Sequence, residues 1–237
     1  MTMLCILLFV GFLLMLYAPL PWLYGRVVRI RQKAQSVSRR QLFLTFDDGP
    51  GSRLTTRILA ILKEHDVRAT FFVLGRNIMG REKILELIAQ EGHLLASHSY
   101  NHLHAWKVLP WRSVADVRRG FEAMDRTLLG KARAGAFRPP NGKLNLFTVL
   151  YLLLQSVRLV YWTVDSGDTW PLSKRNVAYA AERIKSDGGG IVLFHDFDRT
   201  TDRTDEYVLG SLKEVLKTGK DMRLSFACIN QLWQNSE

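Results

Sequence analysis

Apolar and polar residues follow two different periods along residues 41–237. Short apolar runs predict buried strands, and segments with apolar residues three or four positions apart predict helices. The expected strands are Leu42–Phe46, Ala69–Leu74, Leu94–Ser97, Leu159–Val164, Ile191–Phe194 and Arg223–Phe226. The expected helices are Leu54–Glu64, Lys83–Gln90, Val114–Leu129, Leu144–Gln155, Val177–Lys185 and Tyr207–Lys217. Strands that alternate with helices in this way predict an α/β fold built on a parallel sheet.

The N-terminal segment has a different pattern, because residues 1–25 carry no charged side chain. The apolar stretch Met3–Tyr24 is long enough to cross a bilayer, which takes about 20 residues. A cleaved signal peptide fits less well, since no Lys or Arg precedes the stretch and no small-residue cleavage site follows it. The sequence therefore predicts an N-terminal transmembrane helix over 1–25, a basic juxtamembrane linker over 26–40 and one domain over 41–237.

The positive charge is concentrated directly after the apolar stretch. The formal net charge is +11, and six of the 33 basic residues lie between Arg26 and Arg40 with no acid among them. Such a stretch favours contact with anionic lipid headgroups, worth about 1 kcal/mol per residue. It also favours a cytoplasmic position for the domain over 41–237, with an extracytoplasmic one as the alternative. Nucleic acid is not an expected partner, because no basic-aromatic platform or nucleic-acid motif is present. Two cysteines provide no disulfide framework.

Two adjacent carboxylates, Asp47 and Asp48, follow the first expected strand and precede a Gly-Pro turn. Like charges this close raise one another's pKa unless a cation separates their roles. A polar turn is the alternative interpretation of these residues taken alone. The pair becomes informative because other candidate residues also follow expected strands.

Two histidines four residues apart, His98 and His102, lie on one face of a helical turn and can reach one metal ion. A histidine-rich loop is the alternative, since His93 and His104 are close in the sequence. A site would need a third ligand, for which Asp48 is the candidate. Two histidines and one carboxylate leave coordination positions open, which is typical of catalytic metal sites.

Three further segments carry polar residues at strand ends: Arg138–Gly142, Trp162–Trp170 and Ile191–Asp196. Each of them alone is a weak signal, because a lone histidine or arginine at such a position is more often structural. Active sites of parallel α/β barrels lie at the carboxyl ends of the strands. Five such segments in one chain therefore predict an active site there.

In this order, the five segments resemble the motifs of the polysaccharide deacetylases of carbohydrate esterase family four, the NodB-homology domain. They are Thr45–Pro50, His98–His102, Arg138–Gly142, Asp165–Trp170 and Leu193–His195. The resemblance covers about residues 41–230 and implies an incomplete, distorted parallel β/α barrel of about seven strands. Two departures concern the substrate pocket. One residue separates Asp168 from Trp170, and Asn141 occupies a position that is often tyrosine in the family.

The residues and the resemblance predict the same reaction, the hydrolysis of an amide. Asp48, His98 and His102 would hold a divalent metal, with Zn²⁺ expected, which lowers the pKa of its bound water and polarises the carbonyl. Asp47, free of the metal, would accept the proton of that water. The metal and a backbone N–H near Asn141 would stabilise the oxyanion. His195 would then protonate the departing amine.

The resemblance also assigns supporting roles. Asp168 would orient and charge His195, Arg138 would tune Asp47, and Leu193 with either Trp162 or Trp170 would line the pocket for the acyl methyl group. The predicted activity is removal of N-acetyl groups from an amino-sugar polymer or a lipid-linked saccharide. A sugar deformylase of the same fold and a catalytically inactive, membrane-tethered carbohydrate-binding protein are the alternatives.

Overall fold

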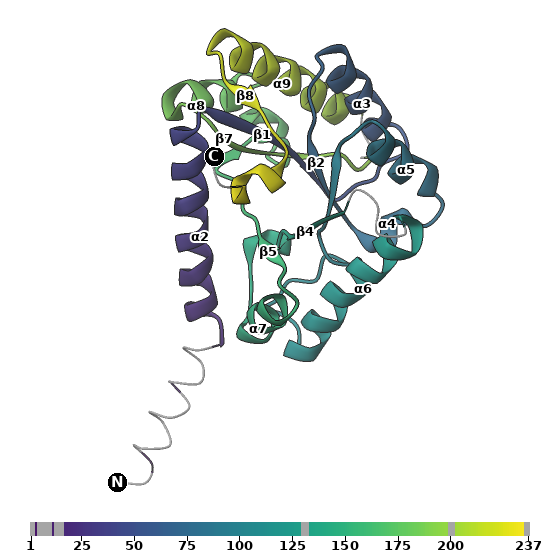
Figure 1. Ribbon diagram of the computed structural model, residues 1–237, viewed down its shortest axis with the longest axis vertical. Helices are drawn as coiled ribbons and strands as arrows, with labels where there is room; N and C mark the ends of the chain where they lie inside the picture. The colour runs from purple at the N-terminus through teal and green to yellow at the C-terminus, as the bar shows by residue number, and fades with distance from the viewer. Residues whose placement is uncertain (1–2, 4–10, 12–16, 129–132, 199–201, 235–237) are drawn as a thin grey trace.

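One parallel sheet forms the centre of the molecule (Figure 1). The computed structural model describes the chain except residues 1–2, 4–10, 12–16, 129–132, 199–201 and 235–237. Within the described part, seven strands follow one another in the order β5-β4-β3-β2-β1-β7-β6, and a short β8 pairs with β1. The strands are β1 (Gln41–Asp47), β2 (Thr70–Val73), β3 (Leu94–Ser97), β4 (Arg133–Phe137), β5 (Arg158–Leu159), β6 (Val164–Asp165), β7 (Gly190–His195) and β8 (Ser225–Phe226). All pairs are parallel, and the predicted incomplete barrel is confirmed as a half-barrel.

Helices surround the sheet (Figure 1). They are α2 (Pro19–Ser38), α3 (Leu54–Glu64), α4 (Gly75–Ile78), α5 (Glu82–Gln90), α6 (Pro110–Leu128), α7 (Leu146–Leu154), α8 (Tyr179–Asp187) and α9 (Asp202–Asp221). Short 3₁₀ turns are η1 (Pro140–Gly142), η2 (Leu172–Lys174) and η3 (Ile229–Trp233). The bounds of α3 and β3 are those that the sequence predicts, whereas α9 begins five residues earlier than expected.

The central strand β1 is buried on both faces. Leu42, Leu44 and Phe46 belong to the large core between sheet and helices, and Phe43 belongs to a second core on the inner face. Because side chains alternate along a strand, Asp47 points to the same inner face as Phe43. Burial on both faces explains why β1 has a continuous apolar run instead of an alternating pattern.

The expected strand Leu159–Val164 is wrong as a single element. The structure divides it into β5 and β6, which lie at opposite edges of the sheet. The segment between them crosses the open side of the half-barrel: Val160 N–H donates to Phe137 of β4 near one edge, and Thr163 N–H donates to Ile191 of β7 near the other. A barrel that does not close leaves a gap between its edge strands, and this crossing segment bridges it.

Residues 26–38 of the expected linker form part of helix α2, which packs along the crossing segment (Figure 1). The buried amide of Gln32 donates to the carbonyl of Leu159 at 2.8 Å and accepts from the N–H of Tyr161 at 3.0 Å. Lys33 forms a 2.9 Å ion pair with Asp187. Buried backbone groups need partners, and a side-chain amide supplies here what a neighbouring strand would supply in a closed barrel.

In the part of the chain that the structure describes, no helix combines the length and the apolar character needed to cross a membrane. Most of the expected span Met3–Tyr24 lies outside the described residues, and its last six residues begin α2. The transmembrane helix therefore stays a prediction from the sequence.

Candidate active site

Asp47 ends β1 at the carboxyl edge of the sheet and is almost completely buried. The parallel register places it beside His195, the last residue of β7. Its Oδ1 accepts a 2.7 Å hydrogen bond from Nη1 of Arg138, which also lies 2.8 Å from the hydroxyl of Thr45. Burial raises the pKa of Asp47, and the positive charge of Arg138 offsets part of that rise. A carboxylate with a raised pKa is suited to accept a proton near neutral pH.

Asp48, His98 and His102 come together at the same edge. The Nε2 atoms of both histidines lie 3.6 Å from Oδ1 of Asp48, and the three atoms lie within 4.8 Å of one another. Nδ1 of His98 lies 2.8 Å from the carbonyl of Arg138, so the ring proton is donated there and the lone pair of Nε2 points into the site. Burial lowers the pKa of His98 to about 3, although the charge of Asp48 opposes this change. The low pKa favours the neutral ring.

The residues present fit a divalent metal ion. Oδ1 of Asp48 is buried and has no hydrogen-bond donor among the described residues. At 3.6 Å, the two imidazole nitrogens are too far away for hydrogen bonds. Three electron-pair donors therefore face one another without a proton between them, and a cation would satisfy all three.

The backbone holds two of these residues in an uncommon conformation. Asp48 has φ 71° and His102 has φ 62°, in the left-handed region that costs free energy for residues other than glycine. Asn77 stabilises the first by donating a 2.7 Å hydrogen bond to the carbonyl of Asp48. The hydroxyl of Ser99 stabilises the second by accepting a 3.1 Å bond from the N–H of His102. The surrounding structure thus holds the candidate ligands in place.

Sequence reasoning missed Asp116, which holds the loop that carries the two histidines. This buried carboxylate of α6 accepts hydrogen bonds from the N–H and the side-chain amide of Asn101 at 3.0 and 2.9 Å. The signal was available, because Asp116 lies on the buried face of an amphipathic helix, where an apolar residue is expected.

His195 is held by Asp168 from two sides. One carboxylate oxygen of Asp168 lies 2.8 Å from Nδ1 of His195, and the other accepts the backbone N–H of His195 at 2.8 Å. Burial disfavours the imidazolium, but Asp168 and the more distant Asp48 and Asp47 outweigh it and raise the pKa of His195 to about 9. Asp168 therefore favours the protonated imidazole, which is the form that can act as an acid.

A second missed residue, Asp196, supports the turn after β1. It is completely buried and accepts a 2.6 Å hydrogen bond from the hydroxyl of Thr55. A side chain at Gly49 would collide with this carboxylate, so the turn requires glycine there. Burial raises the pKa of Asp196 to about 7, with Thr55 opposing and the charges of Asp48 and Asp47 adding to the rise. The sequence offers no signal for this role beyond its place directly after His195.

The model of the polysaccharide deacetylase family matches residues 34–171, more than half of the chain. This chain belongs to the polysaccharide deacetylase family. Members of the family are hydrolases that act on carbon–nitrogen bonds other than peptide bonds. The family resemblance predicted from the five motifs is therefore confirmed.

Individual relatives support the same family. The peptidoglycan-N-acetylglucosamine deacetylase PgdA of Listeria monocytogenes is 30% identical over 210 residues, which cover 87% of this chain and 41% of PgdA. The chain thus spans about two fifths of the length of that relative. The chitooligosaccharide deacetylase of Rhizobium leguminosarum bv. trifolii is 31% identical over 166 residues, covering 66% of this chain and 72% of the relative. The solved Bc1960 peptidoglycan N-acetylglucosamine deacetylase superposes with a TM-score of 0.73 at 26% identity, covering 84% of this chain and 91% of that one.

The deacetylase motifs also supply the candidate substrate-pocket residues, and the structure separates them. Leu193 is buried on β7, on the same strand face as His195. Trp162, in the crossing segment, lines a pocket together with Asn141 of η1. Trp170 lies against Tyr179 at a ring-centroid distance of 4.8 Å and does not line that pocket.

Proposed function

We propose that this deacetylase-family chain removes N-acetyl groups from an amino-sugar substrate with the help of a divalent metal ion. The observation that carries the proposal is the convergence of Asp48, His98 and His102 beside Asp47 and His195. Three candidate ligands, a candidate base and a candidate acid come from the carboxyl ends of β1, β3 and β7. Zn²⁺ is the expected ion, because one carboxylate and two imidazoles form a typical donor set for it.

The two adjacent carboxylates would perform different tasks. The ion held by Asp48, His98 and His102 would lower the pKa of a bound water and polarise the substrate carbonyl. Oδ1 of Asp47 accepts the hydrogen bond from Arg138, whereas Oδ2 lies 3.8 Å from Nε2 of His98 and thus faces the site. Oδ2 is the atom that would accept the proton of the attacking water.

His195 would complete the reaction as the acid. Its Nδ1 proton is directed to Asp168, so the proton on Nε2 remains available for the leaving amine. The strand register places Asp47 and His195 side by side. A base and an acid at neighbouring strand ends can serve attack and departure at one amide carbon.

A backbone amide of η1 could stabilise the oxyanion. The N–H groups of Gly142 and Lys143 donate to Pro139 and Pro140, whereas the N–H of Asn141 donates to none of the described residues. Asn141 also has φ 55°, in the left-handed region, which is uncommon for a residue other than glycine. An amide with no partner among the described residues, in the turn that follows Arg138, supports this role.

The relatives support an amino-sugar polymer as the substrate class. Peptidoglycan and chitooligosaccharide appear in the names of the relatives, and both contain N-acetylglucosamine. A lipid-linked saccharide is the second candidate substrate. Incubation with N-acetylglucosamine oligomers and with polyprenyl-phosphate N-acetylglucosamine, followed by measurement of released acetate, tests the activity. An Asp47→Asn variant is the matched negative control.

Two alternatives give different results in the same assay. A deformylase would release formate from N-formyl sugars and no acetate from N-acetyl sugars. An inactive carbohydrate-binding protein would release neither acid. The intact set of Asp47, Asp48, His98, His102 and His195 favours an active enzyme, since loss of one of them is the simplest route to inactivity.

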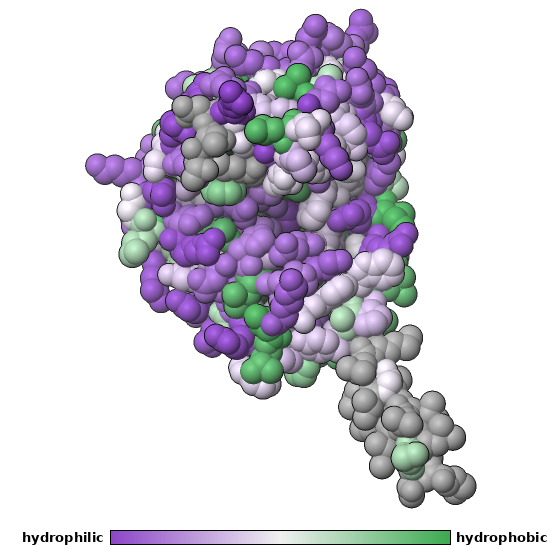
Figure 2. Space-filling model, turned by 180° about the vertical axis from the view of Figure 1, so that it is seen from behind, coloured by the Kyte–Doolittle hydropathy of each residue, from purple (hydrophilic) through white to green (hydrophobic). Residues whose placement is uncertain are grey.

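We further propose that the N-terminal segment anchors the enzyme to a membrane with the catalytic domain on the cytoplasmic side, the extracytoplasmic side being the alternative. The support comes from the apolar stretch Met3–Tyr24 and the basic residues that follow it. Apolar side chains are also exposed on α2 and α7, and Figure 2 shows exposed apolar residues toward that end of the molecule. The exposed apolar residues are Leu20, Leu23, Val27 and Ile30 on α2 and Phe147, Leu150, Leu153 and Leu154 on α7.

A further inference from the structure

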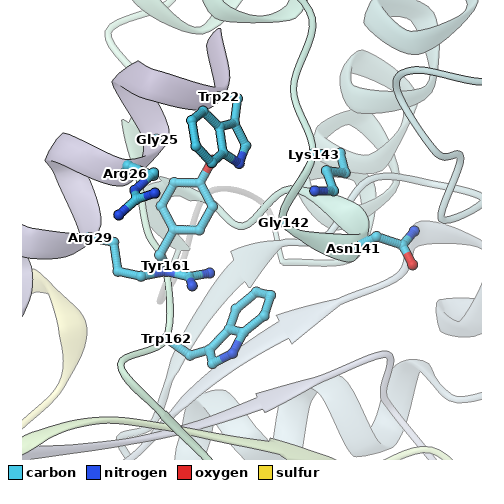
Figure 3. A pocket seen from close by; sticks show the side chains of 9 residues that line it. All are labelled: Trp22, Gly25, Arg26, Arg29, Asn141, Gly142, Lys143, Tyr161 and Trp162. Carbon is cyan, nitrogen blue, oxygen red and sulfur yellow. The ribbon is translucent and has the colours of Figure 1, made fainter. Parts of the chain in front are cut away.

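A basic and aromatic pocket lies between helix α2, the turn η1 and the crossing segment (Figure 3). Its volume is about 250 Å³. Arg26 and Arg29 enter it from α2, and Lys143 lines it after η1. Tyr161 and Trp162 of the crossing segment lie beside Arg29 in Figure 3. The pocket therefore lies between helix α2 and the third deacetylase motif, Arg138–Gly142.

The cations of this pocket are stacked on aromatic rings and not paired with acids. The guanidinium carbon of Arg29 lies 5.2 Å from the ring centroid of Tyr161 and 4.8 Å from that of Trp162. The guanidinium of Arg26 lies 5.0 Å from the ring of Trp22. The ammonium of Lys143 lies 4.4 Å from the ring of Trp106 in the same way.

No carboxylate lines the pocket, and none of these three cations forms an ion pair within the described chain. Burial lowers the pKa of Arg29, the direction that burial imposes on a cation. Asp165, which does not line the pocket, opposes this change only in part. Three cations around a cavity that no carboxylate lines predict that an anion binds there.

The pocket adjoins the catalytic residues. Asn141 and Gly142 line it, and they follow Arg138, whose guanidinium donates to Asp47, by three and four residues in the chain. Gly142 forms part of the wall with φ 65°, and a Cβ there would lie 3.1 Å from Trp162 and 3.7 Å from Nη2 of Arg29. A side chain at this position would therefore intrude between the turn and the two residues that face it.

We propose that this pocket binds a phosphate group of the substrate, so that the enzyme acts on an amino sugar that carries a phosphate. Guanidinium groups match phosphate oxygens with paired, charge-assisted hydrogen bonds, and Lys143 adds a further point charge. The aromatic rings offer flat apolar surfaces on which the rest of such a substrate can lie. This inference rests on the proposed deacetylase function and specifies the substrate of the same site.

The phosphate could come from a lipid carrier or from a soluble sugar phosphate. The test compares acetate release by the full-length, metal-loaded protein from a neutral N-acetylglucosamine oligomer, from N-acetylglucosamine 1-phosphate and from polyprenyl-phosphate N-acetylglucosamine. We expect kcat/KM for a phosphorylated substrate to exceed that for the neutral oligomer by about 10-fold or more. Preference for the polyprenyl substrate alone identifies a lipid carrier, and preference for both phosphorylated substrates identifies the phosphate itself.

Arg29→Met tests the pocket, and Arg31→Met is its matched control. Both variants remove one positive charge from α2, but Arg31 is exposed and lies on another side of the helix. Arg29→Met should reduce the preference for phosphorylated substrate about 10- to 100-fold, mainly through KM, as expected for lost charge-assisted hydrogen bonds. Arg31→Met should leave the preference unchanged. Equal effects of the two variants, or a neutral oligomer hydrolysed as well as the phosphorylated sugars, would overturn the proposal.

A binding measurement separates this inference from the proposed activity. Glucose 1-phosphate has the phosphate but no amide, and glucose lacks both. Titration calorimetry should show that glucose 1-phosphate binds the wild-type protein and the Arg31→Met variant, and that Arg29→Met weakens it. That result supports the phosphate pocket even if no substrate releases acetate, in which case only the deacetylase proposal fails. Binding of glucose 1-phosphate that is no tighter than that of glucose contradicts the pocket.

Discussion

Arg138 donates a 2.7 Å hydrogen bond to Asp47, and both side chains are buried at the carboxyl edge of the sheet. Its guanidinium also lies over the ring of Phe72 at 4.1 Å, while its carbonyl accepts the ring proton of His98. One residue therefore acts on the candidate base through its side chain and on a candidate metal ligand through its backbone. A substitution of Arg138 changes its side-chain contact with Asp47 but leaves its backbone carbonyl in place for His98, so the two effects can be separated.

Arg138→Lys should shift the acidic limb of the kcat/KM profile. Lysine keeps the positive charge but loses the planar fork, so the carboxylate of Asp47 is stabilised less and its pKa rises. The base would then be protonated at a higher pH, and the limb should move to higher pH with it. Arg158→Lys, an exposed substitution on β5, is the control. A limb that stays in place would show that Arg138 does not tune the base.

Removal of one candidate metal ligand should remove the ion. Wild-type protein is expected to hold about one divalent ion per chain, since the three ligands form a single site. Asp48→Asn, His98→Gln and His102→Gln should each lower the metal content measured by elemental analysis, and a chelator should abolish activity. Asp47→Asn should retain the ion while losing activity. An empty site in Asp47→Asn would contradict the proposed division of labour between the two carboxylates.

The alkaline limb of the pH profile should report His195. Against the opposing effect of burial, the charge of Asp168 raises its pKa to about 9. A bound cation offsets the charges of Asp47 and Asp48, so the limb should lie at or below that pH. Asp168→Asn removes the main charge that favours the imidazolium, so the limb should move to lower pH. His195→Ala should lower kcat by about 10²- to 10⁴-fold and remove the limb. Retention of the wild-type limb in His195→Ala would exclude the acid role.

Gln32→Ala should destabilise the domain although it is far from the candidate ligands in the sequence. The substitution leaves the buried carbonyl of Leu159 and N–H of Tyr161 without partners. We expect a loss of about 1–3 kcal/mol in the free energy of unfolding, measured with urea. Gln35→Ala, an exposed change one turn further along α2, should have little effect. Equal stability of the two variants would mean that the helix does not support the crossing segment.

Membrane attachment should depend on the residues before α2. Because α2 begins at Pro19 and packs on the domain, deletion of residues 1–18 should release the protein from the membrane pellet without unfolding it. The intact chain should stay in the pellet through high salt and alkaline washes, which remove proteins held only by surface charge. A reporter fused at Glu237 that works only in the cytoplasm should be active. A fusion active only outside would favour an extracytoplasmic substrate.

The sequence by itself determined most elements of the half-barrel and the residues of its candidate site. Strands such as β3 and helices such as α3 have local periodicity, which a single sequence shows directly. Asp48, His98 and His102 were identifiable because the two histidines have ligand spacing and each segment follows an apolar run. Asp47 and His195 were identifiable through the order of the five motifs. Their roles stay predictions until the variants above are measured.

Only the tertiary structure decided where the chain departs from local periodicity. The run Leu159–Val164 looks like one strand, but the half-barrel does not close, so its ends pair with opposite edges of the sheet. In the sequence, Gln32 and Arg29 look like parts of a charged linker. In the structure they lie on α2, which packs against the crossing segment at the open side of the half-barrel. These contacts join residues more than a hundred positions apart, and no pattern within a short window encodes them. The phosphate pocket exists for the same reason, because it lies where α2 covers the open side of the barrel.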